Sequence, residues 1–309
     1  MNSSIKKVLS YVGFSLCLIS TVFVFRYIQE YAVNIDYKQF QVSEIALGIL
    51  LVFVFGTFNF LLAISWRRIL RFLGVYINQD DASEIYGLSQ LVKYVPGNIL
   101  HLTGRQALGM SMGLPGFRVA KSIVWELGLL ACSGTFFILL VLPLRLETIS
   151  VFWATVSFVA VLVIATALVK KLFGTALMHA LLLQILFLTL TGVNFVVVLR
   201  TLSSPVIPIS NIQLIAAYIV AWLIGLVTPG APAGAGIREL VLMFLLGAYF
   251  SEPQLLASVL ITRFITVGGD FIFFLIAISK KKYNWRFSKE KSEQRCSENQ
   301  VIEKKTMVR

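Results

Sequence analysis

Long apolar runs separated by short polar stretches dominate the sequence. A helix needs about 20 mostly apolar residues to cross the hydrocarbon core of a bilayer. A shorter run at residues 240–250 follows a Gly- and Pro-rich break that completes it. The pattern therefore predicts an all-α, polytopic integral membrane protein, a helical bundle with about eight spans. The seven longer runs cover residues 8–28, 45–65, 120–142, 149–169, 176–199, 210–228 and 254–279.

The composition favours a membrane protein over a soluble one. Hydrophobic residues make up 58% of the chain and charged residues 14%, whereas soluble domains carry about 25% charged residues. Too few polar side chains are present to cover a water-soluble body of 309 residues. The first run follows Lys6 and Lys7 and has no convincing cleavage site after it, so we expect a retained anchor. Residues 1–283 are predicted to form one membrane domain.

The basic residues indicate how the spans are oriented. With the N-terminus inside and eight crossings, 22 of the 27 Lys and Arg residues lie on the cytoplasmic side and 4 lie outside. Cytoplasmic loops carry such an excess, so we predict a cytoplasmic (inner) membrane protein with both termini inside. Residues 284–309 are basic and lack a hydrophobic pattern, which predicts a disordered cytoplasmic tail. No nucleic-acid-binding motif accompanies the net charge of +12, so we expect no nucleic-acid partner.

Two segments interrupt the apolar pattern at membrane depth. Each contains Pro-Gly and reaches an arginine nine residues after the proline: Pro96 to Arg105, and Pro229 to Arg238. Proline lacks a backbone N–H and glycine adopts turns that other residues avoid, so neither segment forms an uninterrupted lipid-facing helix. Irregular backbone at this depth is tolerated only where protein buries it or where it lines a wet cavity. We therefore predict two re-entrant segments.

The two breaks also predict a repeat. Paired Gly/Pro-broken segments in corresponding places of two halves point to a transporter binding site. The two prolines are 133 residues apart, which is close to half of the membrane portion. The sequence leaves open whether the two repeats are parallel or inverted. It also leaves open that both breaks are surface loops whose common spacing is a coincidence.

The broken segments carry a family resemblance. Tyr94-Val-Pro-Gly97 with Gly104-Arg105, followed by the Gly-rich stretch from Pro229 to Glu239, resembles the lysylphosphatidylglycerol synthase transmembrane region family. This family includes the flippase half of the bacterial multiple peptide resistance factor. The similarity covers about residues 5–280. It implies a bundle of about eight helices with re-entrant segments that handles or translocates lipid-linked polar groups.

The resemblance has one departure. The aminoacyl-transferring members of the family carry a large soluble synthase domain, whereas about 30 residues follow the last predicted span here. We therefore expect this chain to act without that catalytic domain and not to be an enzyme. No HExxH or CxxC spacing is present, and His101 has no suitable second histidine, so no metal, cofactor or catalytic residue is predicted.

Ionisable residues inside the predicted spans are candidates for a binding site, because burying each costs about 2.5–3.5 kcal/mol on insertion scales. Arg263 and Asp270 share a helix face but lie seven residues apart, too far for an ideal direct pair, so each needs a partner elsewhere or bridging water. Glu126 falls within the first two turns of its span, near enough to the end for an interfacial position. Arginine suits phosphate because its planar guanidinium donates two parallel hydrogen bonds. The carboxylates would balance the arginines or carry coupling protons.

These residues are predicted to line one polar, substrate-binding cavity between the two halves. The competing explanation is that the embedded charges form structural ion pairs that hold the bundle together. Four polar residues in apolar helices are predicted to make interhelical hydrogen bonds: Asn59, Gln184, Thr191 and Asn194. The candidate substrate-binding residues are Tyr94, Pro96, Gly97, Arg105, Glu126, Pro229, Gly230, Gly234, Gly236, Arg238, Glu239, Arg263 and Asp270.

Three functions fit the sequence. The first is a protein that binds and translocates a phospholipid or a lipid-linked polar substrate, which the paired breaks and embedded charges favour. The second is a membrane scaffold that assembles envelope-biosynthesis proteins through its basic tail. The third is a membrane-embedded lipid-phosphate transferase, which is disfavoured because the predicted external loops are short and contain few acidic residues.

The charge bias makes the topology testable. Because 22 basic residues lie on one side and 4 on the other, we expect reporters fused to either terminus to be active only in the cytoplasm. An externally active C-terminal fusion would refute this orientation.

Overall fold

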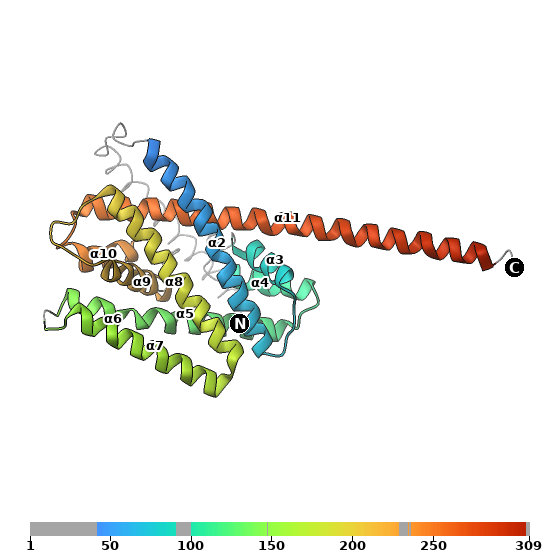
Figure 1. The fold of residues 1–309 in the computed structure, drawn as a ribbon, viewed down its shortest axis with the longest axis horizontal. Coiled ribbons are helices and arrows are strands. Elements are labelled where there is room, and N and C mark those ends of the chain that lie inside the picture. The colour runs from blue at the N-terminus through green and yellow to red at the C-terminus, as the bar shows by residue number, and fades with distance from the viewer. Residues whose placement is uncertain (1–41, 91–99, 147, 229–233, 235, 307–309) are drawn as a thin grey trace, which may run out of the picture.

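A computed structural model describes residues 42–306, except for 91–99, 147, 229–233 and 235; the side chains of 100–103 and 280–306 are not described. Every regular element in this part of the chain is helical (Figure 1). The elements are α2 (Val42–Phe72), α3 (Gln79–Gln90), α4 (Leu100–Ser111), α5 (Gly116–Phe136), α6 (Ile138–Val141), the 3₁₀ helix η3 (Leu142–Leu144), α7 (Val151–Phe173), α8 (Thr175–Leu202), α9 (Asn211–Val227), α10 (Ile237–Leu246) and α11 (Glu252–Thr306).

Within the described residues, five helical stretches are long and apolar enough to cross a membrane. They confirm the predicted all-helical class and indicate a multi-pass membrane protein. The predicted run at residues 8–28 lies outside the described part. The five stretches are Val42–Phe72, Gly116–Leu144, Val151–Phe173, Thr175–Leu202 and Glu252–Ser279.

Two of the predicted spans, at residues 210–228 and 240–250, correspond to short helices. Helix α9 has 17 residues and α10 has 10, so both are shorter than the five long stretches. They pack against each other, and Val206 before α9 donates its N–H to the carbonyl of Tyr249 after α10 at 2.8 Å. The two helices, called the arms below, therefore form a helical hairpin. Its open end, where α9 begins and α10 ends, lies at one end of the bundle. Apolar composition alone does not distinguish such arms from spans.

Helices α3 and α4 form a second pair of short helices. Arg118, in the first turn of α5, donates to the carbonyl of Gly74 in the α2–α3 turn at 3.1 Å. The start of α3 therefore lies beside the start of α5, at the end of the bundle where α2 finishes. Figure 1 shows α3–α4 and α9–α10 at opposite ends of the bundle.

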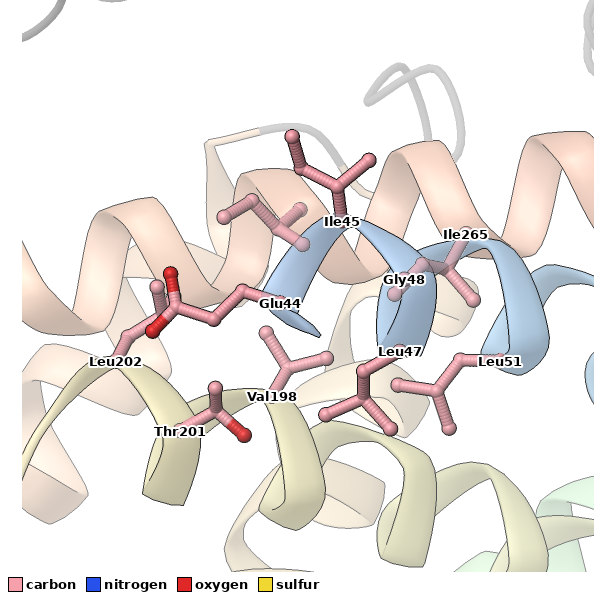
Figure 2. Close-up of a pocket in the computed structure, with 10 residues that line it drawn as sticks. Glu44, Ile45, Leu47, Gly48, Leu51, Val198, Thr201, Leu202 and Ile265 are labelled. Carbon is pink, nitrogen blue, oxygen red and sulfur yellow. The ribbon is translucent and has the colours of Figure 1, made fainter. Parts of the chain in front are cut away.

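Helices α2, α8 and α11 form the centre of the bundle. The start of α2, the end of α8 and the third and fourth turns of α11 line an apolar cavity of about 300 Å³ (Figure 2). Because Glu44 of α2 and Leu202 of α8 share this cavity, α2 and α8 run antiparallel. The α3–α4 pair follows α2 and the α9–α10 hairpin follows α8, so the antiparallel arrangement places them at opposite ends.

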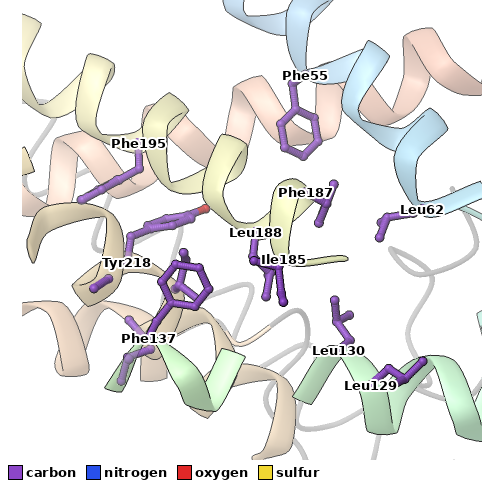
Figure 3. Close-up of a cluster of buried hydrophobic side chains, with 14 of the residues drawn as sticks. Phe55, Leu62, Leu129, Leu130, Phe137, Ile185, Phe187, Leu188, Phe195 and Tyr218 are labelled. Atoms are coloured by element: carbon purple, nitrogen blue, oxygen red, sulfur yellow. The ribbon is translucent and has the colours of Figure 1, made fainter. Parts of the chain in front are cut away.

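Aromatic side chains fill the space between the central helices and their neighbours (Figure 3). Phe195 of α8 stacks on Tyr218 of α9 with ring centroids 4.6 Å apart. The ring centroids of Phe55 on α2 and Phe187 on α8 lie 6.2 Å apart. Helix α7 contributes little to this core, since Ala154 is its only buried residue. Its apolar side chains suit a peripheral helix that faces lipid.

The final helix continues beyond the apolar stretch. Its helical backbone runs through Thr306, and residues 307–309 lie outside the described part. The disordered tail expected for residues 284–309 stays a prediction. No glycine or proline occurs from residue 280 to the C-terminus, and Lys, Glu, Gln and Arg, which are frequent there, are good helix formers.

The α2–α11 crossing provides a stability prediction. A Cβ on Gly269 would lie 2.7 Å from Phe55 Cδ1 and 2.9 Å from the backbone nitrogen of Gly56. Overpacking of this kind typically costs about 1–3 kcal/mol, so Gly269→Ala is expected to lower thermal stability in detergent. Gly128→Ala is the matched control, because a Cβ on Gly128 meets nothing within 4 Å. Equal melting temperatures for the two variants would contradict a close crossing.

Candidate functional site

An ion pair between α4 and α5 lies inside the bundle. Arg105 donates from Nη1 to Glu126 Oε2, and the two residues are only 3% and 6% exposed. Helix α5 begins at Gly116, so Glu126 lies ten residues into the helix. It is therefore deeper than the interfacial position predicted from the sequence.

Three neighbours complete the surroundings of this pair. The hydroxyl of Tyr86 donates to Glu126 Oε1 at 2.7 Å, and Arg105 Nε donates to Ser89 Oγ at 3.2 Å. The guanidinium carbon lies 4.0 Å from the ring centroid of Tyr86 and 5.5 Å from that of Trp66. Aromatic faces stabilise a cation more strongly when water is excluded. These five residues form the α4–α5 cluster.

A polar network joins the α4–α5 cluster to α11. Asp270 is fully buried and accepts a hydrogen bond from Asn59 Nδ2 at 2.9 Å. Asn59 Oδ1 in turn accepts from Gln90 Nε2 at 3.0 Å. Because Gln90 directly follows Ser89, the end of α3 contacts both Arg105 and the partner of Asp270.

A second ion pair joins α10 to α11. Arg263 Nη2 lies 3.0 Å from Glu239 Oε1 and also donates to the carbonyl of Gly234 at 3.2 Å. The side chains of Arg263 and Glu239 are 21% and 18% exposed, so this pair is less enclosed than the first. Seven residues of α11 separate Arg263 from Asp270, which corresponds to a rise of about 10 Å.

Arg238 belongs to the same region as the second pair. Its guanidinium carbon lies 5.8 Å from the ring centroid of Trp222. A Cβ on Gly234 would lie 3.0 Å from Arg238 Nε, and Gly234 has a φ of +71°, so both space and backbone conformation require glycine there. Arg238 and Arg263 thus both approach Gly234. We call Arg238, Glu239, Arg263 and Gly234 the α10–α11 cluster.

The clusters differ in charge. The α10–α11 cluster carries two guanidinium groups and one carboxylate. The α4–α5 cluster with its link to Asp270 carries one guanidinium and two carboxylates. The guanidinium groups of the α10–α11 cluster are of the type that binds phosphate oxygens in a bidentate manner.

The predicted site residues are only partly brought together. Arg105, Glu126 and Asp270 belong to one connected network, whereas Gly234, Arg238, Glu239 and Arg263 lie in the other cluster. The described side chains therefore form two groups rather than one set around a single cavity. Gly236 caps α10 with a φ of +82°. Five candidates lie outside the described residues: Tyr94, Pro96, Gly97, Pro229 and Gly230.

Sequence reasoning missed the contribution of α3. Its residues Tyr86, Ser89 and Gln90 lie in a polar segment that the apolar pattern excluded from the spans. Their spacing of three and four residues places them on one helix face, which was the available indication.

The predicted interhelical hydrogen bonds are partly confirmed. Asn59 bonds to Asp270 on α11, and Gln184 Nε2 donates to the backbone carbonyl of Glu126 at 3.3 Å. Thr191 instead bonds within its own helix, to the carbonyl of Phe187. Asn194 has no hydrogen-bond partner among the described residues.

No model of a known protein family matches this sequence, and no curated protein matches it. The resemblance to the lysylphosphatidylglycerol synthase transmembrane region family therefore stays a prediction based on the short motifs.

The two ion pairs differ in how much stability depends on them. Removing one partner of a buried ion pair typically costs about 3–5 kcal/mol, because the other charge stays buried. Glu126→Ala is therefore expected to lower the thermal stability of the detergent-solubilised protein strongly. Glu239→Ala is expected to have a smaller effect, because Arg263 is less buried and also donates to the carbonyl of Gly234. An equal loss in the two variants would contradict the difference in enclosure.

Proposed function

We propose that this protein binds an anionic phospholipid or a lipid-linked phosphate and translocates it across the cytoplasmic membrane. The observation that carries the proposal is the α10–α11 cluster, in which Arg238 and Arg263 both approach Gly234 inside an apolar bundle. Charges inside a membrane bundle are costly and are therefore functional candidates. Arginine suits such a substrate because its planar guanidinium donates two parallel hydrogen bonds to phosphate oxygens.

The depth of the charges supports this proposal. The midpoint of the Glu252–Ser279 stretch lies between Arg263 and Asp270. At 1.5 Å per residue, Arg263 is about 4 Å from that midpoint and Asp270 about 7 Å from it, on the other side. Transporters commonly bind their substrate near the bilayer midplane.

The two pairs of short helices support a re-entrant arrangement. The arms α9 and α10 are about 25 Å and 15 Å long, whereas the hydrocarbon core is about 30 Å thick. Both arms open at the same end of the bundle. In this arrangement they enter and leave the membrane on one side. The five described stretches and the predicted run at residues 8–28 then give six crossings with two re-entrant pairs, which leaves both termini cytoplasmic.

The positive-inside bias orients the two pairs. Arg67, Arg68 and Arg71 lie in the last turns of α2, and a basic helix end of this kind favours the cytoplasmic side. The α3–α4 pair then enters from the cytoplasm, and the α9–α10 hairpin enters from outside. Of the two arrangements that the sequence left open, this favours inverted repeats, in which a substrate site lies between segments from opposite faces.

The proposal predicts a specific defect in Arg238→Lys. Lysine keeps the charge but loses the bidentate fork, and one hydrogen bond to a charged group is worth about 1.5–3 kcal/mol. We therefore expect translocation to slow by about 10- to 100-fold. The measurement uses phosphatidylcholine vesicles with a trace of acyl-labelled fluorescent phosphatidylglycerol, and a membrane-impermeant quencher reports movement between leaflets.

The matched control is Arg200→Lys, at the end of α8 and away from both clusters; it should translocate at the wild-type rate. A variant that ends at residue 283 should also retain translocation. A wild-type rate in both Arg238→Lys and Arg263→Lys would reject the phosphate-binding role. Loss of activity only on removal of the tail would favour the scaffold alternative.

A further inference from the structure

The two halves of the bundle share an order of elements. In each, a long central helix is followed by two short helices and then another long helix: α2–α3–α4–α5, and α8–α9–α10–α11. The long helices that open the halves, α2 and α8, run antiparallel and pack together. The second short helix carries an arginine nine residues after a proline in both halves, at Arg105 and Arg238.

Each half also carries an ion pair at the same structural place. In both, the pair joins the second short helix to the long helix that follows. Arg105 of α4 pairs with Glu126 of α5, and Glu239 of α10 pairs with Arg263 of α11. The acid and the base have exchanged helices between the halves. Each pair therefore holds one short helix against the bundle.

The two ion pairs differ in how far their side chains are buried. The side chains of the α4–α5 pair are 4% and 8% exposed, whereas those of the α10–α11 pair are 21% and 18% exposed. The α4–α5 pair is therefore the more enclosed of the two. A transporter that alternates between two faces needs this asymmetry in any single state.

Helix α11 contacts both pairs of short helices. It meets α3 tightly, because a Cβ on Gly87 would lie 2.5 Å from the Cβ of Ala277. It meets α10 through the Arg263–Glu239 pair. Packed helices move as rigid elements, so a shift of α11 toward one contact changes the other.

We propose that the Arg105–Glu126 and Glu239–Arg263 pairs are opposing gates that α11 couples, so that opening one closes the other. This inference rests on the proposed translocation function and adds its conformational device. In the present state both ion pairs are formed, and the α10–α11 pair is the less enclosed of the two. The chemistry is reversible ion pairing, and no covalent step is involved.

Cysteine labelling tests the coupling directly. The background variant replaces Cys17, Cys132 and Cys296 with serine. The reporter is Ile237→Cys, which lies at the half-buried start of α10 and outside both ion pairs. A membrane-impermeant maleimide is added to right-side-out vesicles without substrate.

The decisive variant weakens the distant gate. Glu126→Gln breaks the α4–α5 pair and is expected to lower labelling of Ile237→Cys severalfold, because opening that gate closes the other. Tyr86→Phe is a milder variant, since it removes only the hydroxyl that donates to Glu126 and keeps both charges; the same direction is expected. Tyr76→Phe, in the exposed α2–α3 turn, is the control and should label like the parent.

Local opening is measured in the same background. Glu239→Gln is expected to raise labelling of Ile237→Cys, because it frees α10 from α11. Unchanged or increased labelling in both Glu126→Gln and Tyr86→Phe would overturn the coupled gates and leave the pairs as static structural contacts.

The cysteine labelling and the lipid assay test the two proposals separately. Translocation of phosphatidylglycerol without reciprocal labelling would retain the proposed function and reject the gates. Reciprocal labelling without translocation of any anionic lipid would retain the gates and reject the proposed substrate.

Discussion

The cost of an unpaired charge inside an apolar bundle is the constraint on which the rest of this structure depends. Arg105 and Glu126 are almost completely buried, and either one alone would destabilise the bundle by several kcal/mol. Their pairing sets the register between α4 and α5. Tyr86 donates a further hydrogen bond to Glu126, and Ser89 accepts one from Arg105, so the position of α3 follows from the same requirement.

Helix α11 extends this constraint across the molecule. Asp270 accepts its hydrogen bond from Asn59 on α2, and Arg263 pairs with Glu239 on α10. Rotation of α11 by one residue, about 100°, would break both contacts. The close approach of Gly56 and Gly269 leaves little room for such a rotation, because small residues let two helix backbones meet. The helix is therefore held in register by polar contacts on two sides and by close packing between them.

The structure also gives the embedded charges a spatial order. Arg105 and Glu126 lie with the α3–α4 pair, and Glu239 and Arg263 join the α9–α10 hairpin to α11. The two pairs of short helices occupy opposite ends of the bundle, so the described charges are divided between two places.

The sequence by itself determined the class of the protein and the extent of its long helices. The run at 149–169 became α7 and the run at 176–199 became α8, because the transfer of apolar residues into lipid adds up along the chain and is readable locally. The need for partners on other helices was also predictable for Arg263 and Asp270, since their separation on one helix follows from the helical rise.

Only the tertiary structure decided which charge meets which. Glu126 pairs with Arg105 rather than with the other embedded arginines, and the polar helix α3 supplies contacts that its composition did not reveal. Helices α9 and α10 pack against each other as a hairpin, and each is shorter than the five long stretches. These outcomes depend on the register and crossing of helices distant in sequence, and a pattern of apolar residues carries no information on either.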